Sequence, residues 1–119
     1  MRADKEHQAQ KNLFTWARLS RHKYPELDWM FAIPNGGLRN VRVAVKLKAE
    51  GVRAGVPDIF LPIPRGGSSG LFIELKIKPN KITQKQSEWL TALARHQYEA
   101  VVAYGWEEAK EIIENYLNK

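Results

Sequence analysis

The chain has 119 residues and a mass of 13.7 kDa, which suits one domain with one hydrophobic core and is too short for two. Hydrophobic residues make up 44% and charged residues 27%, which excludes a disordered composition. No apolar run approaches the roughly 18 residues of a membrane helix. The chain also lacks cysteine, a signal-peptide pattern and a phosphate-binding Walker loop. We therefore expect a single domain over residues 1–119 in a reducing cytoplasm, with no membrane partner and no nucleotide cofactor.

The net charge of +6 is concentrated in the first part of the chain. Residues 1–65 carry 12 Lys and Arg against 6 Asp and Glu, whereas residues 66–119 carry 7 of each. Between residues 35 and 56, five basic residues face only Glu50. Such a block suggests an anionic partner, most simply nucleic acid, although a solvated basic helix face remains the alternative.

Hydrophobic periodicity and turn residues predict eight elements in chain order. A helix over residues 4–22 precedes a short strand over 29–33, which ends at a Pro-Asn-Gly-Gly turn. The pattern then predicts a helix from residue 38 to Gly51, strands over 58–63 and 71–77, a helix over 83–95, a strand over 99–104 and a helix over 107–117. A hairpin followed by a helical crossover gives an α/β fold, with a mixed β-sheet flanked by helices.

The strand over residues 71–77 carries the first candidate for chemistry. Its period of two places Leu71, Ile73, Leu75 and Ile77 on one face, and Phe72, Glu74 and Lys76 on the other. Taken alone, this pattern also describes a half-buried strand with an ordinary polar outer face.

The preceding strand supplies a second carboxylate. Asp58 opens that strand after Gly55-Val56-Pro57, 16 residues before Glu74, so a hairpin brings Asp58 alongside Glu74 and Lys76. Two carboxylates with waters and a backbone carbonyl suit Mg²⁺, which activates water and neutralises charge on a phosphoryl oxygen. A neighbouring lysine stabilises the transition state, so the trio suits a phosphodiester substrate.

Three further polar residues each extend an apolar helical stripe toward the rim of the core. Glu6 lines up with Leu13 and Ala17, Lys48 with Val41 and Val45, and Gln86 with Leu90 and Leu93. Each has a structural alternative. Glu6 would stabilise a helix N-terminus through the helix dipole, and the aliphatic part of Lys48 would cover apolar surface while its ammonium group stays in water. Gln86 would complete a capping box with Thr83.

These motifs, taken in order, resemble a known nuclease family. Gly55-Val56-Pro57-Asp58 followed by Glu74-Leu75-Lys76 resembles the PD-(D/E)XK nuclease superfamily. Glu6, the Pro-Asn-Gly-Gly turn, the segment from Lys48 to Asp58 and Thr83-x-x-Gln86-x-x-Trp89-Leu90 are similar to its VRR-NUC branch, the virus-type replication-repair nucleases. The resemblance spans roughly residues 5 to 110, and the ordered set is far more specific than its pieces.

The resemblance implies a restriction-endonuclease-like core and a metal-dependent DNA endonuclease. Asp58, Glu74 and the Leu75 carbonyl would hold Mg²⁺ or Mn²⁺, Lys76 would position the attacking water, Glu6 would be an accessory carboxylate and Gln86 an auxiliary site residue. Stand-alone members of this size resemble phage or bacterial enzymes that act as homodimers on branched DNA such as Holliday junctions. Two symmetric cuts require two symmetric sites.

The basic residues supply candidate phosphate contacts. Arg39, Arg42 and Lys46 recur along one face of the second helix, with Lys48 and Arg53 beyond them. Arg65 precedes Gly66-Gly67-Ser68-Ser69-Gly70, which lacks the helix that a serine hydrolase motif requires, so we predict a hairpin loop that reaches toward DNA. Three other interpretations stay open: a catalytically silent DNA-binding module, a flap or single-strand nuclease, and an RNA-directed or exonucleolytic enzyme.

Overall fold

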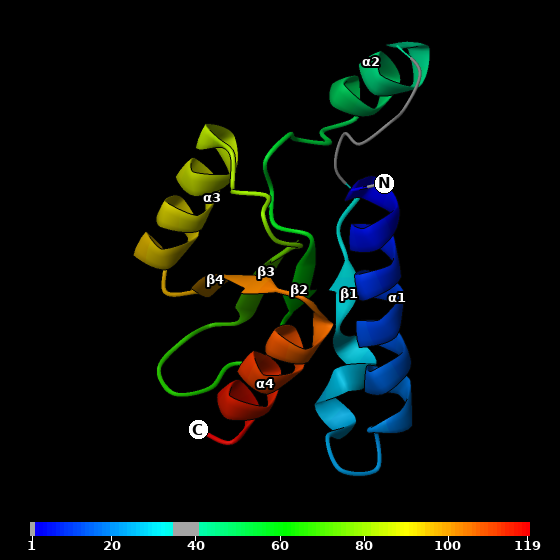
Figure 1. Ribbon diagram of the computed structural model, residues 1–119. Coiled ribbons are helices and arrows are strands. Elements are labelled where there is room, and N and C mark those ends of the chain that lie inside the picture. The colour runs from blue at the N-terminus through cyan, green and yellow to red at the C-terminus, as the bar shows by residue number, and fades with distance from the viewer. Residues whose placement is uncertain (1, 35–40) are drawn as a thin grey trace.

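The computed structural model describes residues 2–34 and 41–119, which form a four-stranded sheet with helices packed against it (Figure 1). The elements follow the predicted order with one addition, the short 3₁₀ helix η1. Their bounds are α1 (Arg2–Leu19), η1 (Pro25–Trp29), β1 (Phe31–Ala32), α2 (Val41–Ala49), β2 (Ile59–Leu61), β3 (Leu71–Lys76), α3 (Gln84–Arg95), β4 (Glu99–Tyr104) and α4 (Trp106–Leu117). The predicted mixed α/β fold is confirmed.

The sheet has the strand order β1-β2-β3-β4. Strand β2 runs antiparallel to both β1 and β3, and β4 lies parallel to β3 after the crossover through α3. Ile59 pairs with Ile73, so the residue before β2, Asp58, lies beside Glu74 of β3. The topology therefore brings together the two acidic motifs that the sequence separates by 16 residues.

The hydrophobic core lies between the sheet and the pair of helices α1 and α4. Leu71, Ile73 and Leu75 of β3 are fully buried, as their alternation predicts. They belong to one cluster with the apolar stripes of the two helices, which include Ala9, Leu13 and Ala17 of α1 and Ala109, Ile113, Tyr116 and Leu117 of α4. This core holds β3 rigidly, so the side chains of its other face have a fixed frame.

Two predictions on the first third of the chain are wrong in detail. The first helix ends at Leu19 rather than residue 22, and Leu19 is exposed. Trp29, expected at the start of a strand, ends η1 and is 67% exposed. Pro25 occupies the first turn of η1 and fixes its φ angle for a helical turn, so the extended strand begins two residues after Trp29.

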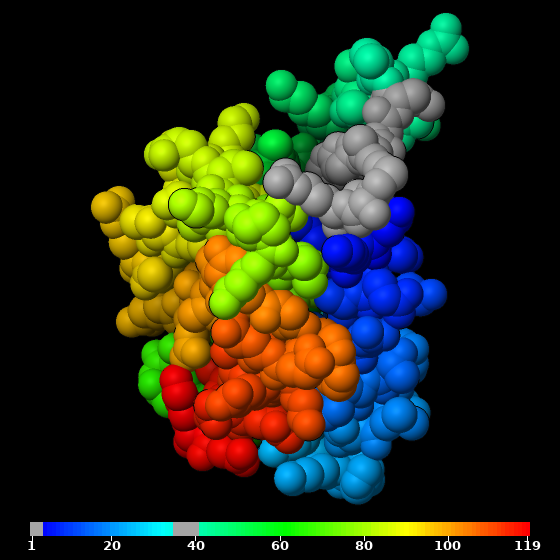
Figure 2. All heavy atoms as spheres, in the orientation of Figure 1, coloured from blue at the N-terminus to red at the C-terminus, as the bar shows by residue number. Residues whose placement is uncertain are grey.

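Helix α2 departs most from expectation, because its predicted core stripe faces solvent. Val41 is 78% and Val45 64% exposed, and α2 projects beyond the rest of the molecule (Figure 2). A groove of about 590 Å³ lies between α2 and α3, with Ala44, Leu47 and Trp89 among its lining residues. The periodicity correctly predicts an amphipathic helix, but the rest of the described chain leaves much of its apolar face uncovered.

Candidate active site

Asp58 is positioned by a tight approach between the segment before β2 and helix α3. Gly55 has a φ of +89°, and a Cβ atom there would lie 2.9 Å from the Cβ of Lys85, so only glycine fits. The Asp58 carbonyl accepts a hydrogen bond from the Ile33 N–H at 2.7 Å, which anchors the segment to β1. Its carboxylate Oδ2 accepts a hydrogen bond from the Leu75 N–H at 2.8 Å.

The Asp58 carboxylate thus takes the place of a backbone partner for β3. The N–H and C=O of one strand residue point to the same side, so the Leu75 carbonyl points toward the same gap beyond the start of β2. The Asp58 carboxylate and the Leu75 carbonyl oxygen therefore lie at one gap in the ladder of backbone hydrogen bonds between β2 and β3.

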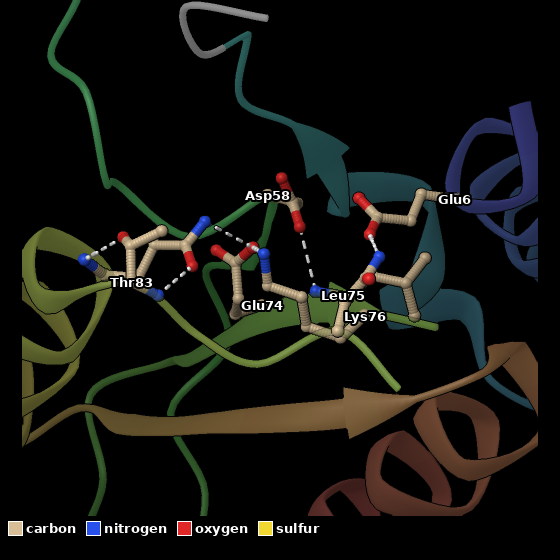
Figure 3. A network of polar contacts seen from close by, with 8 residues as sticks. Glu6, Asp58, Glu74, Leu75, Lys76 and Thr83 are labelled. Carbon is tan, nitrogen blue, oxygen red and sulfur yellow. Dashed lines mark hydrogen bonds and ion pairs between the residues drawn. The ribbon is translucent and has the colours of Figure 1, made fainter. Parts of the chain in front are cut away.

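Glu74 and Lys76 lie on the face of β3 opposite to Leu75, and both are buried. Glu74 is 2% exposed and Lys76 8%. The Lys76 Nζ lies 3.8 Å from Glu74 Oε2, and in Figure 3 the side chains of Asp58, Glu74 and Lys76 converge on one point. Taken alone, the sequence pattern also describes an ordinary polar outer face, whereas the structure buries both side chains on this face.

Gln86 reconciles two interpretations that the sequence left open. Its backbone N–H donates to Thr83 Oγ1 at 3.2 Å and its Oε1 accepts from the Thr83 N–H at 2.8 Å, so the capping box is complete. The remaining amide group, Nε2, donates to Glu74 Oε2 at 3.1 Å. One side chain both caps α3 and holds the buried carboxylate.

Glu6 reaches the same region from α1 through Asn80, a residue that no sequence motif singles out. Glu6 Oε2 accepts a hydrogen bond from Asn80 Nδ2 at 2.9 Å, and the charge of Glu6 acts on Glu74. In the sequence, Asn80 is visible only as part of the turn with Pro79 that ends the preceding strand. A contact between residues 74 positions apart has no local signal, so periodicity could not have found it.

The electrostatics of the site are dominated by the buried Glu74 carboxyl. Its pKa is raised from 4.5 to about 9, first by burial and then by the neighbouring Asp58, through its charge and a hydrogen bond between the two side chains. Lys76 opposes this effect and Glu6 adds to it. Glu74 Oε1 is buried and has no hydrogen-bond partner among the described residues. A cation would stabilise carboxylates in this arrangement.

The donor set fits a hard divalent metal ion. Within residues 2–34 and 41–119, no group of three His, Cys, Asp or Glu side chains is arranged to hold a metal. Mg²⁺, however, binds proteins through one or two carboxylates and keeps several waters. Asp58, Glu74 with its unpartnered Oε1, and the Leu75 carbonyl meet that requirement.

The predicted DNA-contacting residues fall into different settings. Arg39 lies outside the described residues. Arg42 and Lys46 are exposed on α2, as predicted, while Lys48 is exposed beside the groove rather than at the end of a buried stripe. Arg53 also borders the groove, and its guanidinium lies 5.5 Å from the centre of the Trp89 ring.

Arg65 lies in a structural contact rather than at the end of a free loop. Its guanidinium forms an ion pair with Glu26 and donates to the carbonyls of Pro64 and Leu117. The expected loop over residues 66–70 is present, with a bridge between Arg65 and Ser68, and it lies beside the C-terminal end of the chain.

Comparison with known proteins identifies the family. The VRR-NUC domain model matches residues 4–107, which is most of the chain. The chain belongs to the VRR-NUC family. A solved structure of a VRR-NUC domain protein superimposes with a TM-score of 0.81 at 32% sequence identity, covering 96% of this chain and 88% of the other. A search of curated proteins found no relative that matches.

Family membership assigns a general activity. VRR-NUC domains are nuclease domains, so this chain has a nuclease-type function on DNA, and such nucleases generally depend on a divalent metal ion. In the described part of the chain, no helix is long and apolar enough to cross a membrane.

Proposed function

We propose that this VRR-NUC protein is an endonuclease that uses Mg²⁺ or Mn²⁺ to hydrolyse phosphodiester bonds in branched DNA, in the manner of a Holliday-junction resolvase. One observation carries the chemistry: the buried Glu74 carboxylate lies beside Asp58 with one oxygen unpartnered, and Lys76 lies next to it. The opening in the ladder at the Leu75 carbonyl, beside this group, supports the metal assignment.

The chain's own residues divide the work of the reaction. Asp58, Glu74 and the Leu75 carbonyl would hold the cation, which when bound neutralises developing charge and lowers the pKa of water. The Lys76 ammonium, held within 3.8 Å of Glu74, orients the attacking water and stabilises negative charge on the phosphoryl oxygens. Gln86 fixes the Glu74 carboxylate, and Glu6 adds an accessory carboxylate that Asn80 holds in place.

The basic surface supplies DNA affinity without base specificity. Arg42 and Lys46 on α2, with Arg39, Lys48 and Arg53, would contact phosphates, which fix register on the substrate. We assign Arg65 a weaker part, because Glu26 already engages its guanidinium.

The proposed preference for branched substrates requires the protein to act as a homodimer. Two symmetric cuts need two sites related by a two-fold axis. The exposed valines of α2 offer an apolar surface for a second copy. We further propose that residues 1–119 act as one nuclease unit in the cytoplasm of a bacterium or a phage-infected cell.

The test is a cleavage assay on end-labelled four-way junction, flap, single-stranded and linear duplex DNA, with Mg²⁺ or Mn²⁺. Glu74→Ala and an EDTA lane are the negative controls, and Glu111→Ala, an exposed change on α4, is the matched positive control. Metal-dependent cutting of the junction, abolished in both negative controls and kept in Glu111→Ala, supports the proposal. Cutting of flaps or single strands alone would identify these, rather than junctions, as the substrate. Binding without cutting on any DNA indicates a silent DNA-binding module.

A further inference from the structure

Three phenylalanines from neighbouring strands form a continuous aromatic row across the sheet. Phe31 of β1 pairs with Phe60 of β2, and Phe60 pairs with Phe72 of β3. The Phe60 and Phe72 rings are stacked, with centroids 4.1 Å apart and planes at 13°, and Phe31 meets Phe60 edge-on at 5.7 Å. Tyr98, just before β4, packs edge-on against both inner rings. We call Phe31, Phe60 and Phe72 the aromatic row.

The aromatic row lies on the same face of the sheet as the candidate active site. Phe72 is two residues before Glu74 on β3, and Phe60 is two residues after Asp58. Side chains two positions apart on a strand share a face and are separated by roughly 7 Å. The row is therefore the next row of side chains beside the two carboxylates.

Local structure holds the row in a fixed arrangement. The Phe60 ring lies over Gly70, where a Cβ atom would come within 2.8 Å of Phe60 Cε1. Glycine at this position lets the ring lie flat against β3 and stack on Phe72. Tyr98 supports the stack from the β4 side, so the inner rings are preorganised.

The row opens to solvent at its outer end. Phe60 and Phe72 are half-buried, and Phe31, on the edge strand, is 48% exposed. The helices α1 and α4 share the core formed with Leu71, Ile73 and Leu75, on the opposite face of β3. The aromatic row thus crosses the sheet from its edge strand, one row of side chains away from the carboxylates. Two of its members, Phe31 and Phe60, belong to the part of the chain that carries the excess of basic residues.

We propose that the aromatic row binds an unpaired base of the DNA strand next to the scissile phosphate. Aromatic side chains stack on bases of any sequence, and this is how proteins hold single-stranded nucleic acid beside a basic surface. The inference rests on the proposed nuclease function and deepens it, because a base stacked on these rings must have left its duplex. The substrate class is therefore DNA in which a nucleotide next to the cut is unpaired, as at a flap, or becomes unpaired when the protein opens the branch point of a junction.

A second copy of the chain is the less favoured occupant of this surface. A stable protein interface buries about 800 Å² on each partner. The aromatic row offers one half-exposed ring at a strand of two residues, which is far smaller. Its position beside the carboxylates has a direct use for a substrate and none for a dimer contact.

The test measures stacking directly, without relying on cleavage. Oligonucleotides carry 2-aminopurine at single positions in a flap, a single strand and a matched duplex, and binding is followed in EDTA. In the wild-type protein, we expect 2-aminopurine fluorescence to be quenched at one or two unpaired positions. Phe31→Ala should abolish the quenching and bind single-stranded DNA about tenfold more weakly, which corresponds to about 1.4 kcal/mol. Phe31→Trp should keep both properties.

The controls separate this inference from the proposed function. Leu19→Ala changes an exposed apolar residue on α1 and should behave as wild type in binding. Unchanged quenching in Phe31→Ala, or an equal loss of affinity for duplex DNA, overturns the base-stacking site, as does conversion of a dimer to a monomer by this substitution. Metal-dependent cleavage by the wild-type protein is scored separately, so the nuclease assignment can fail while the stacking result stands, and the reverse.

Discussion

Replacing Glu74 with glutamine should make the metal-free protein more stable at neutral and alkaline pH. The folded protein raises the pKa of this carboxyl from 4.5 to about 9, first through burial and then through Asp58. A pKa raised by folding stabilises the protein below pH 4.5, and this stability is lost as the pH rises toward 9. Each pH unit above the ordinary pKa lowers the free energy of unfolding by about 1.4 kcal/mol, so the loss at pH 7 is about 3 kcal/mol.

The assay is thermal and urea unfolding of wild type and Glu74→Gln at pH 5, 7 and 9, with EDTA and with Mg²⁺. Without metal, wild type should lose stability between pH 5 and 9, whereas the pH dependence of Glu74→Gln should be much flatter. At pH 7 the difference of about 3 kcal/mol corresponds to a shift in melting temperature on the order of 10 °C. Mg²⁺ should stabilise wild type, because the ion binds the ionised form of Glu74 and displaces its proton, and should have little effect on the variant.

Glu111→Gln, an exposed change of the same kind on α4, is the control and should follow wild type at every pH. Parallel pH profiles for wild type and Glu74→Gln in EDTA would refute the reasoning, because the buried carboxyl would then carry no excess cost. Equal stabilisation of both proteins by Mg²⁺ would remove Glu74 from the metal site.

Three further outcomes are expected. Arg42→Ala combined with Lys46→Ala should weaken binding to all DNA alike. The slope of log affinity against log salt concentration should become shallower by roughly 0.9 for each phosphate that the protein no longer neutralises, and an unchanged slope in an anisotropy titration contradicts the assignment. Val45→Lys should convert the proposed dimer to a monomer in light scattering while leaving the circular dichroism spectrum intact, whereas a dimer that survives places the interface elsewhere. Thr83→Ala should lower the free energy of unfolding by about 1 kcal/mol through loss of the helix cap, and a cost near zero in urea denaturation would show that the cap contributes nothing.

The sheet and its acidic pair could be predicted because they depend on short-range patterns. The alternation of Leu71, Ile73 and Leu75 indicates β3 and its buried face, and the hairpin spacing places Asp58 beside Glu74. The capping box at Thr83 and Gln86 is also visible in the sequence, because its members are three residues apart. Each of these signals lies within a single element or between adjacent elements.

The remaining features depend on which elements meet in space. Periodicity alone also describes Glu74 and Lys76 as an ordinary polar outer face, but both are buried, and Gln86 from the first turn of α3 donates a hydrogen bond to Glu74. Periodicity likewise predicts a buried stripe on α2, because it identifies an amphipathic helix without identifying what covers it. The contact between Glu6 and Asn80 joins distant parts of the chain, and no local pattern encodes it.

The double role of Gln86 links the order of the active site to the local stability of one helix turn. Fraying of the first turn of α3 breaks the capping box and at the same moment releases the hydrogen bond to Glu74. By thermodynamic reciprocity, a cation that holds Glu74 in place opposes that fraying. The backbone amide of Gln86 should therefore exchange its hydrogen more slowly when metal is bound. The exchange rate at the start of α3 then shows whether the site holds a metal ion.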